Sequence, residues 1–396
     1  MLIFIAAGNN LDLTEGILNP VTINYPQHFS DSKRNICSPA DSMNNLVIGA
    51  VSDNFENNGV HVLSPDINFP ASYTRKFNFS FNDIIKNSKR ISRHLSKPDI
   101  AFPGGDVDLS VSSEHTGIKV ISIEQGIFYD RDCGTSLSAP LLANLAAKII
   151  RKYPTLINNM QSVKAIIINS TVEPKFGNIF KDINIDAKKL IGKGIPETEK
   201  AIYSNDNSAT LLLEDTITPG QIQTYQLHVP EYLQDLKKTG NILEISATIC
   251  YKFLPVHESH IAYCPVCIAF GFFNNVEINN QNSEIIKLKN GVTWSEDYYF
   301  GTKLLSNCQK VIFRLNKEIL VREEFALKIA VNCKMHKLLS QTQKAQLPRE
   351  YPFSIALTIS EIPHKGELSG NLYSELEAIN NLENIADLEA TLDNEA

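Results

Sequence analysis

The first half of the chain mixes short apolar runs with one much longer run. Ile3–Asn10 is a short apolar segment that ends on small residues and an asparagine, which predicts a strand. The run from Leu141 to Tyr153 is long and apolar enough to predict a buried helix. Short strands mixed with helices indicate a layered α/β core, which we assign to residues 1–203.

The pattern changes after about residue 204, where β-rich runs alternate with glycine and proline. Several short strands with turn residues between them predict an antiparallel β-sandwich of jelly-roll type over residues 204–365. The predicted strands are Ala209–Leu213, Ile222–Val229, Ile242–Phe253, Ile261–Phe273, Val311–Leu315, Ala326–Cys333 and Phe353–Ile362.

The last segment, residues 366–396, has a different spacing of apolar residues. Leucines and isoleucines recur three or four positions apart from Leu372 to Leu392, which predicts an amphipathic helix with an acidic outer face. We expect this helix to pack on its own domain or to fray. The alternative is that it docks on a partner or forms a short coiled coil.

Charge and composition narrow the classes of function. The net charge of −7 over 396 residues comes from the acidic tail, so no basic face supports nucleic-acid binding. No stretch reaches the roughly 20 apolar residues needed to span a bilayer. Seven cysteines, an odd number in a long chain, argue against a disulfide framework. The short apolar start lacks a basic leader, so we predict a cytoplasmic protein, unless a signal peptide precedes Met1.

One group of residues has the composition of a metal site. Cys250, His257, His260, Cys264 and Cys267 lie close together in sequence, and thiolate and imidazole ligands hold zinc in closed tetrahedral sites. However, Cys264 and Cys267 would face opposite sides of a strand. We therefore expect buried thiols there, with no metal and no other cofactor.

The segment with the clearest chemistry is Gly134-Thr135-Ser136-Leu137-Ser138-Ala139-Pro140. It runs into the predicted helix, so it would place a serine at the head of that helix. A helix N-terminus offers unpaired N–H groups and a positive dipole end to an oxyanion. Pro140 would fit the first helical turn, where its missing N–H costs nothing. Taken alone, the segment is equally well explained as an N-cap.

Two further segments, in order along the chain, change that balance. Ala6-Ala7-Gly8-Asn9 ends the first strand, and Lys97-Pro98-Asp99-Ile100-Ala101-Phe102-Pro103-Gly104 precedes the serine. Together with Gly134-Thr135-Ser136 they resemble the subtilisin-like serine protease family, although Phe102 replaces the usual alanine. The resemblance covers roughly the first half of the chain. It implies a three-layer α/β core with a parallel sheet, a core strand at Leu46–Val51 and a helix at Gln161–Ser170.

The resemblance also implies roles for individual residues. Ser136 would attack the scissile carbonyl of a polypeptide substrate and form an acyl-enzyme. The Asn9 side-chain amide, together with the Ser136 backbone N–H, would hold the oxyanion, with Asn10 as the substitute if the register differs by one. The small residues that would line the substrate cleft are Ala6, Ala7, Gly8 and Gly134.

Two members of the family's catalytic triad have no counterpart in this sequence. Subtilases carry Asp and then His before the Asn strand, so both positions would precede Met1. His28, His61 and His115 do not resemble the family's His-Gly-Thr helix start, and we expect them to be loop or core-edge histidines. Without a base to deprotonate Ser136, the chain alone should be a poor hydrolase.

Three explanations remain open for this gap. We favour truncation of a protease at its N-terminus, since Met1 opens what should be a central strand. A separate chain that supplies Asp and His is the second, and a pseudoprotease that binds peptides or partners is the third. The related sedolisin plan is a weaker alternative, because it needs an aspartate where Asn9 stands.

Overall fold

The computed structural model describes most of the chain. The described residues are 1–10, 24–31, 34–53, 63–76, 97–108, 112–181, 185–234, 240–257, 263–273, 293–294, 306–322, 326–363, 368, 371–379 and 385–387. They divide into two compact units. The first consists of Met1–Ile149, Ser170–Ala201 and Leu304–Ser306, and the second of Ile150–Asn169, Ile202–Lys303 and Asn307–Ala396.

The first unit is built on a parallel sheet with the strand order β1-β2-β3. Its strands are β1 (Phe4–Ala6), β2 (Leu46–Val51) and β3 (Ile100–Pro103). All six residues of β2 are buried, as expected for the central strand of a parallel sheet whose two faces are covered. The structure therefore has the predicted mixture of α and β elements, with a parallel sheet in the first half.

The Lys97-Pro98-Asp99 turn fastens β3 to β2. The Asp99 carboxylate accepts a hydrogen bond of 2.8 Å from the Val47 N–H and lies 2.6 Å from the Lys97 ammonium. Both charged side chains are buried away from water, so each charge is compensated by the other. This contact gives a physical reason for the Lys-Pro-Asp motif.

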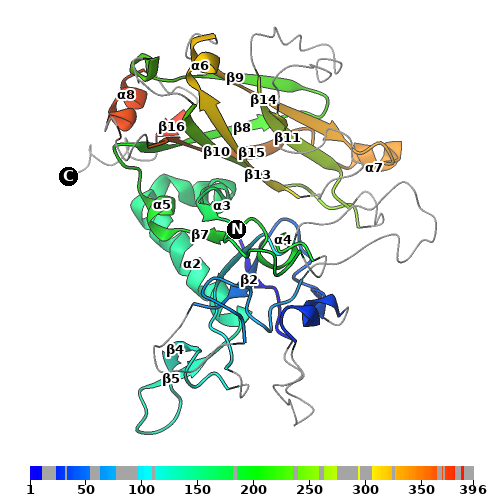
Figure 1. Cartoon of the computed structure of the whole chain (residues 1–396). Helices are drawn as coiled ribbons and strands as arrows, with labels where there is room; N and C mark the ends of the chain where they lie inside the picture. Colours follow the sequence, from blue (N-terminus) through cyan, green and yellow to red (C-terminus); the bar gives the residue numbers. More distant parts are fainter. Residues whose placement is uncertain are drawn as a thin grey trace. The chain divides into compact units, whose positions relative to one another are not determined.

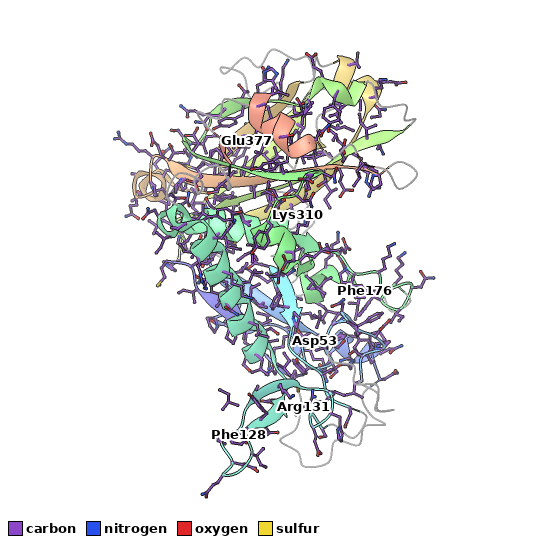
Figure 2. All side chains as sticks on the ribbon, turned by 90° about the vertical axis from the view of Figure 1, so that its left-hand side faces the viewer. Asp53, Phe128, Arg131, Phe176, Lys310 and Glu377 are labelled. Carbon is purple, nitrogen blue, oxygen red and sulfur yellow. The ribbon has the colours of Figure 1, made fainter. Side chains whose placement is uncertain are left out.

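The long helix of the first unit is α2 (Thr135–Lys152), which lies beside the parallel sheet in both views (Figures 1 and 2). Its buried residues Leu142, Leu145, Ala146 and Ile149 recur three or four apart, as on one face of a helix. The helix begins earlier than predicted, so Pro140 lies in its interior and not in its first turn. The Ser136 carbonyl therefore lacks the N–H donor that residue 140 would otherwise provide.

The smaller elements of the first unit surround this sheet and helix. They are η3 (Gln27–Ser30), the antiparallel pair β4 (Ile118–Ile121) and β5 (Tyr129–Asp132), the pair β6 (Thr171–Val172) and β7 (Ile195–Pro196), α4 (Lys188–Ile191) and α5 (Thr198–Ile202).

The second unit contains two antiparallel sheets. One has the order β13-β10-β15-β8-β16 and the other β12-β11-β14-β9. The strands are β8 (Ser208–Ile217), β9 (Ile222–His228), β10 (Asn241–Tyr251), β11 (Val266–Phe273), β12 (Thr293–Trp294), β13 (Cys308–Asn316), β14 (Ala326–Met335), β15 (Tyr351–Glu361) and β16 (Ile385–Asp387). The helices are η5 (Pro154–Asn158), α3 (Met160–Asn169), η6 (Glu231–Gln234), α6 (Lys317–Arg322), α7 (Gln341–Ala345) and α8 (Leu372–Ile379).

A polar interface joins α3 to the five-stranded sheet. The buried Asn169 amide accepts hydrogen bonds of 3.0 Å from the Ser246 and Thr248 hydroxyls and donates one of 2.7 Å to the Thr358 hydroxyl. At the other end of α3, the Ser162 hydroxyl donates to Ser354 at 2.8 Å. These bonds explain how a sheet face with hydroxyl side chains can be buried.

The C-terminal segment differs from the single helix predicted over Leu372–Leu392. The helix α8 ends at Ile379, and Ile385–Asp387 form β16, which pairs with Leu211–Leu213 of β8. The remaining positions of that prediction lie outside the described residues. The strand predicted from Ile261 begins at Val266, and its first two positions are also outside the described residues.

Candidate active site

The N-terminus of α2 presents Ser136 to solvent. Ser136 is the second residue of the helix and is exposed, whereas Gly134 and Thr135 are buried. The turn before it is tied to the end of β3, because the Gly134 N–H donates to the Gly104 carbonyl at 2.9 Å. The structure therefore places Ser136 at the positive end of an 18-residue helix, as the sequence predicts.

Thr135 links this turn to the loop after β1. The Thr135 N–H and hydroxyl both donate to the Asn9 side-chain oxygen at 2.9 Å. The same hydroxyl accepts from the Gly8 N–H at 3.1 Å. These three bonds fix the Asn9 amide beside the helix N-terminus, although Asn9 and Thr135 are far apart in sequence.

Gly134 leaves a small space between the Ser136 hydroxyl and two hydrogen-bond donors. A Cβ at position 134 would lie 2.9 Å from the Ser136 Oγ, 3.0 Å from the Asn9 Nδ2 and 3.7 Å from the Ser136 N. The hydroxyl, the side-chain amide and the backbone N–H therefore border one space. A side chain at 134 would occupy it, which explains the need for glycine at this position.

Neither donor at this space is used within the described part of the chain. No described residue accepts a hydrogen bond from the Ser136 N–H or from the Asn9 Nδ2. Two unused donors therefore lie beside a serine hydroxyl. Of the two asparagines considered from sequence, Asn9 is the one whose side-chain amide borders this space. Asn10 is buried, and its backbone N–H donates to the Tyr73 carbonyl at 2.8 Å.

The Tyr73 side chain contacts the backbone that follows β3, next to the turn before Ser136. Its hydroxyl donates to the carbonyls of Gly104 and Gly105 at 2.7 and 2.8 Å, and its ring is fully buried. A Cβ on Gly104 would meet the Tyr73 hydroxyl at 2.9 Å and the Ser138 Oγ at 2.5 Å. The backbone that receives the Gly134 N–H is therefore closely packed.

Burial raises the pKa of the thiol next to the site. Burial, with smaller effects from Asp106 and Asp132, raises the pKa of Cys133 to about 12. Cys133 is thus protonated at neutral pH and is a poor nucleophile. Burial also raises the pKa of Asp106, whose carboxylate accepts hydrogen bonds from Ser64 and Ser72.

No described histidine or carboxylate hydrogen-bonds the Ser136 hydroxyl. His28 contacts the Ser72 carbonyl through Nε2 at 2.8 Å and the Asn24 carbonyl through Nδ1 at 3.3 Å. Burial and then Arg34 lower its pKa to about 4. His115 is exposed, and His61 lies outside the described residues.

The other residues predicted to line the substrate cleft take different places. Ala6 ends β1 and is half-buried, and Gly8 is half-buried beside Thr135. Ala7 is buried against Ala40 and Val47. Their substrate contacts stay a prediction.

The cysteines of the second unit show no metal site within the described ranges. No three His, Cys, Asp or Glu side chains there come together as ligands. Cys250 and Cys264 are buried, and His260 lies outside the described residues. Among the same residues, none of the helices has both the length and the apolarity to cross a bilayer.

Thr135 and Tyr73 are the contributors that the sequence did not indicate. Thr135 lies inside the recognised motif, but its bond to Asn9 joins positions 126 apart in sequence. Tyr73 lies in a stretch without any recognised pattern. No local signal could have connected either residue with Ser136.

Comparison with known proteins identifies the class to which this fold and site belong. The family model of the subtilases (peptidase S8) matches residues 1–200. This is half of the chain, and it includes Asn9, Gly134 and Ser136. The chain belongs to the subtilase family.

Individual relatives are more distant. The uncharacterized protein y4bN of Sinorhizobium fredii is 23% identical over 295 residues, which cover 70% of this chain and 65% of that protein. The match thus spans slightly less than two thirds of this relative's length.

Two solved structures give weak matches. The prenylagaramide maturation protease PagA is 16% identical, with 42% of this chain and 44% of that chain covered and a TM-score of 0.25. A chain of the desmodium yellow mottle tymovirus is 9% identical, with 41% of this chain and 92% of that chain covered and a TM-score of 0.17. Neither likeness is close enough to bear on function.

Proposed function

We propose that this chain carries the nucleophile and the oxyanion hole of a serine endopeptidase that cleaves polypeptides. The observation that supports it best is the space at Gly134, which the Ser136 hydroxyl, the Asn9 amide and the Ser136 N–H all border. Membership of the subtilase family agrees with this chemistry.

In the proposed reaction, the Ser136 Oγ forms a bond to the scissile carbonyl carbon while a base takes its proton. The carbonyl oxygen becomes an oxyanion that accepts hydrogen bonds from the Asn9 Nδ2 and the Ser136 N–H. When the C–N bond breaks, the amine leaves with the proton, and the acyl group stays on Ser136. Water then hydrolyses this ester and restores the hydroxyl.

A base and its aspartate are not found beside Ser136 among the described residues. We propose that a polypeptide segment outside the described residues supplies them, either in a longer form of the chain or in a separate chain. Until it does so, Ser136 stays protonated and the chain is a poor hydrolase. We also propose that it works in the cytoplasm on polypeptides.

A small base can test the nucleophile without the missing segment. Imidazole should enter the open site, take the Ser136 proton and allow p-nitrophenyl acetate to acetylate Ser136 with release of p-nitrophenolate. We expect imidazole-dependent acetylation of Ser136, detected by mass spectrometry of its peptide. Ser136→Ala should show only the background reaction of imidazole with the ester.

The alternative is a pseudoprotease that binds polypeptides without cutting them. It is favoured by the finding that no described histidine or carboxylate contacts Ser136. If p-nitrophenyl acetate does not acetylate Ser136 in the presence of imidazole, in a chain that still binds peptides, the result would support this alternative over the peptidase.

A further inference from the structure

The β4–β5 hairpin exposes an unusual set of large apolar side chains. Ile121 and Phe128 are each 84% exposed, Tyr129 is 64% exposed, and Ile123 is fully exposed. Figure 2 shows Phe128 farther out along the hairpin than Arg131. Soluble proteins rarely leave such a contiguous patch without a binding role.

Two of these exposed residues, Ile121 and Tyr129, lie on the same face of the hairpin. Ile121 lies opposite Tyr129, and Lys119 lies opposite Arg131, so these four side chains share a face. The Lys119 ammonium lies 5.7 Å from the centre of the Tyr129 ring. We call these four residues the Ile121–Tyr129 face.

The opposite face of the hairpin has a different charge. The register places Val120 opposite Asp130 and Ile118 opposite Asp132. The two faces therefore differ in charge: the Ile121–Tyr129 face carries two basic residues, whereas the other carries two aspartates. An acidic ligand would be attracted to the Ile121–Tyr129 face and repelled from the other.

The base of the hairpin is firmly held. The Arg131 guanidinium donates to the Gly117 carbonyl at 3.0 Å, and the Ser113 hydroxyl donates to the Arg131 carbonyl at 3.2 Å. The Thr116 hydroxyl donates to the Asp106 carbonyl at 2.7 Å. A ligand on the hairpin would thus be held at a defined position relative to the rest of the first unit.

The hairpin leads directly into the candidate active site. Strand β5 ends at Asp132, shortly before Gly134 and Ser136. The seven residue-to-residue steps from Tyr129 to Ser136 span at most about 25 Å in an extended chain. An extended polypeptide on the hairpin could therefore continue to the nucleophile.

The backbone of the hairpin also suits an extended ligand. The pair forms a two-stranded sheet, so each strand has one edge without a neighbouring strand among the described residues. Such edges bind extended peptides as an added strand, with side-chain contacts on alternate positions.

We propose that the Ile121–Tyr129 face binds the polypeptide substrate, through an extended segment in which an apolar and an acidic side chain stand two positions apart and so point to the same side. This inference rests on the proposed function, since it takes the ligand to be the substrate of Ser136. Its occupant is a substrate segment away from the scissile bond.

The test compares three short fluorescent peptides with the full chain by fluorescence anisotropy. One peptide repeats valine-serine-glutamate-serine, which places valine and glutamate on the same side of an extended chain. The second replaces glutamate with lysine, and the third replaces valine with serine. We expect the first to bind most tightly. The double variant Ile121→Ser/Tyr129→Ser should bind it at least about tenfold more weakly, because exposed apolar anchors dominate such interfaces.

A matched control is available in the second unit. Ile312 of β13 is 54% exposed, so Ile312→Ser removes a similar apolar surface away from the hairpin and should leave peptide binding unchanged. Ser136→Ala should bind as the parent does. Equal binding by the parent and the hairpin variant would overturn the inference. So would a dimer that the hairpin substitutions dissociate without changing peptide affinity, because a second copy would then be the occupant.

The imidazole assay separates this inference from the proposed function. Acetylation of Ser136 together with hairpin-independent peptide binding would refute only the binding face. Hairpin-dependent binding without acetylation of Ser136 would refute the peptidase and leave a polypeptide-binding surface. It would also refute the assignment of the bound polypeptide as a substrate.

Discussion

Thr135 connects the loop that carries Asn9 to the helix that carries Ser136. Its hydroxyl is the acceptor for the Gly8 N–H and a donor to Asn9, and the side chain is buried. Thr135→Val keeps the shape but leaves the Gly8 N–H without its partner. We expect the free energy of unfolding in urea to fall by about 1–3 kcal/mol. Thr135→Ser retains the hydroxyl and should lose less than half as much. Equal losses would show that the hydroxyl does not matter.

Asn9 supplies the side-chain donor of the proposed oxyanion hole. Asn9→Ala removes this donor and leaves Ser136 in place, so it should slow imidazole-dependent acetylation by about 10²–10³, as removal of such donors does in other serine peptidases. The measurement is the rate of Ser136 acetylation at fixed imidazole. Asn10→Ala is the matched control and should leave the rate near that of the parent. The opposite result would move the role to Asn10.

His28 should make the protein sensitive to acid. Its pKa is about 4 in the folded chain, and the unfolded chain titrates near 6.5. As the pH falls from 6.5 to 4, the unfolded state takes up the proton first, so the free energy of unfolding decreases. The loss from this group is at most about 3 kcal/mol, and it is absent above pH 6.5. Urea unfolding at several pH values checks it. His28→Gln should flatten this part of the profile, and an unchanged slope would contradict the assignment.

The residues of the site were predictable where the chain carries them in short motifs. Ser136 and Gly134 lie in one motif, and Asn9 ends a recognisable strand. Their common space at Gly134 was not predictable, because it depends on how β1 and α2 meet. The contact of Thr135 with Asn9 was not predictable for the same reason.

At the scale of elements, Asn169 joins α3 to hydroxyl side chains of two strands, β10 and β15. Asn169→Leu would leave the hydroxyls of Ser246, Thr248 and Thr358 without this partner in a buried interface. We expect the second unit to lose about 2–4 kcal/mol of unfolding free energy. Trp294, the one tryptophan of the chain, lies in β12 of this unit, so its fluorescence can follow the unfolding.

A double-mutant cycle supplies the control for this interface. Thr358→Val alone removes one hydroxyl that Asn169 contacts, and it should cost less in the Asn169→Leu background than in the parent. Additive effects of the two substitutions would mean that the two side chains do not interact in solution.

Two elements that the family resemblance implied were predicted well. The β2 strand has the predicted bounds, and α3 is within one residue of its predicted ends. The predicted C-terminal helix was wrong at Ile385–Asp387, which form a strand on the edge of a sheet. Ile385 pairs with Leu213, a contact across the second unit that local spacing does not reveal.

At the scale of the whole molecule, the sequence suggested one boundary near residue 203, and the two compact units also divide there. However, Ile150–Asn169 belong to the second unit. The sequence of this segment gave no indication of its unit. Its residue Asn169 is held by serine and threonine side chains of strands that lie far along the chain. The division into domains that was based on the sequence pattern stays a prediction.

Two units with separate buried residues should unfold in two steps. Ile48 of β2 and Ile249 of β10 are both fully buried, one in each unit. Replacing either by alanine should cost about 2–5 kcal/mol in its own unit. Trp294 fluorescence reports the second unit, whereas far-ultraviolet circular dichroism reports both.

In urea, Ile249→Ala should therefore shift the Trp294 transition to lower concentration. Ile48→Ala should leave the Trp294 transition in place and shift only the remaining part of the circular dichroism signal. The two substitutions are matched in residue type and burial. A difference between their effects is therefore due to the unit in which each residue lies. If both shift a single transition that the two probes share, the chain unfolds as one cooperative body, and the two units are not independent in stability.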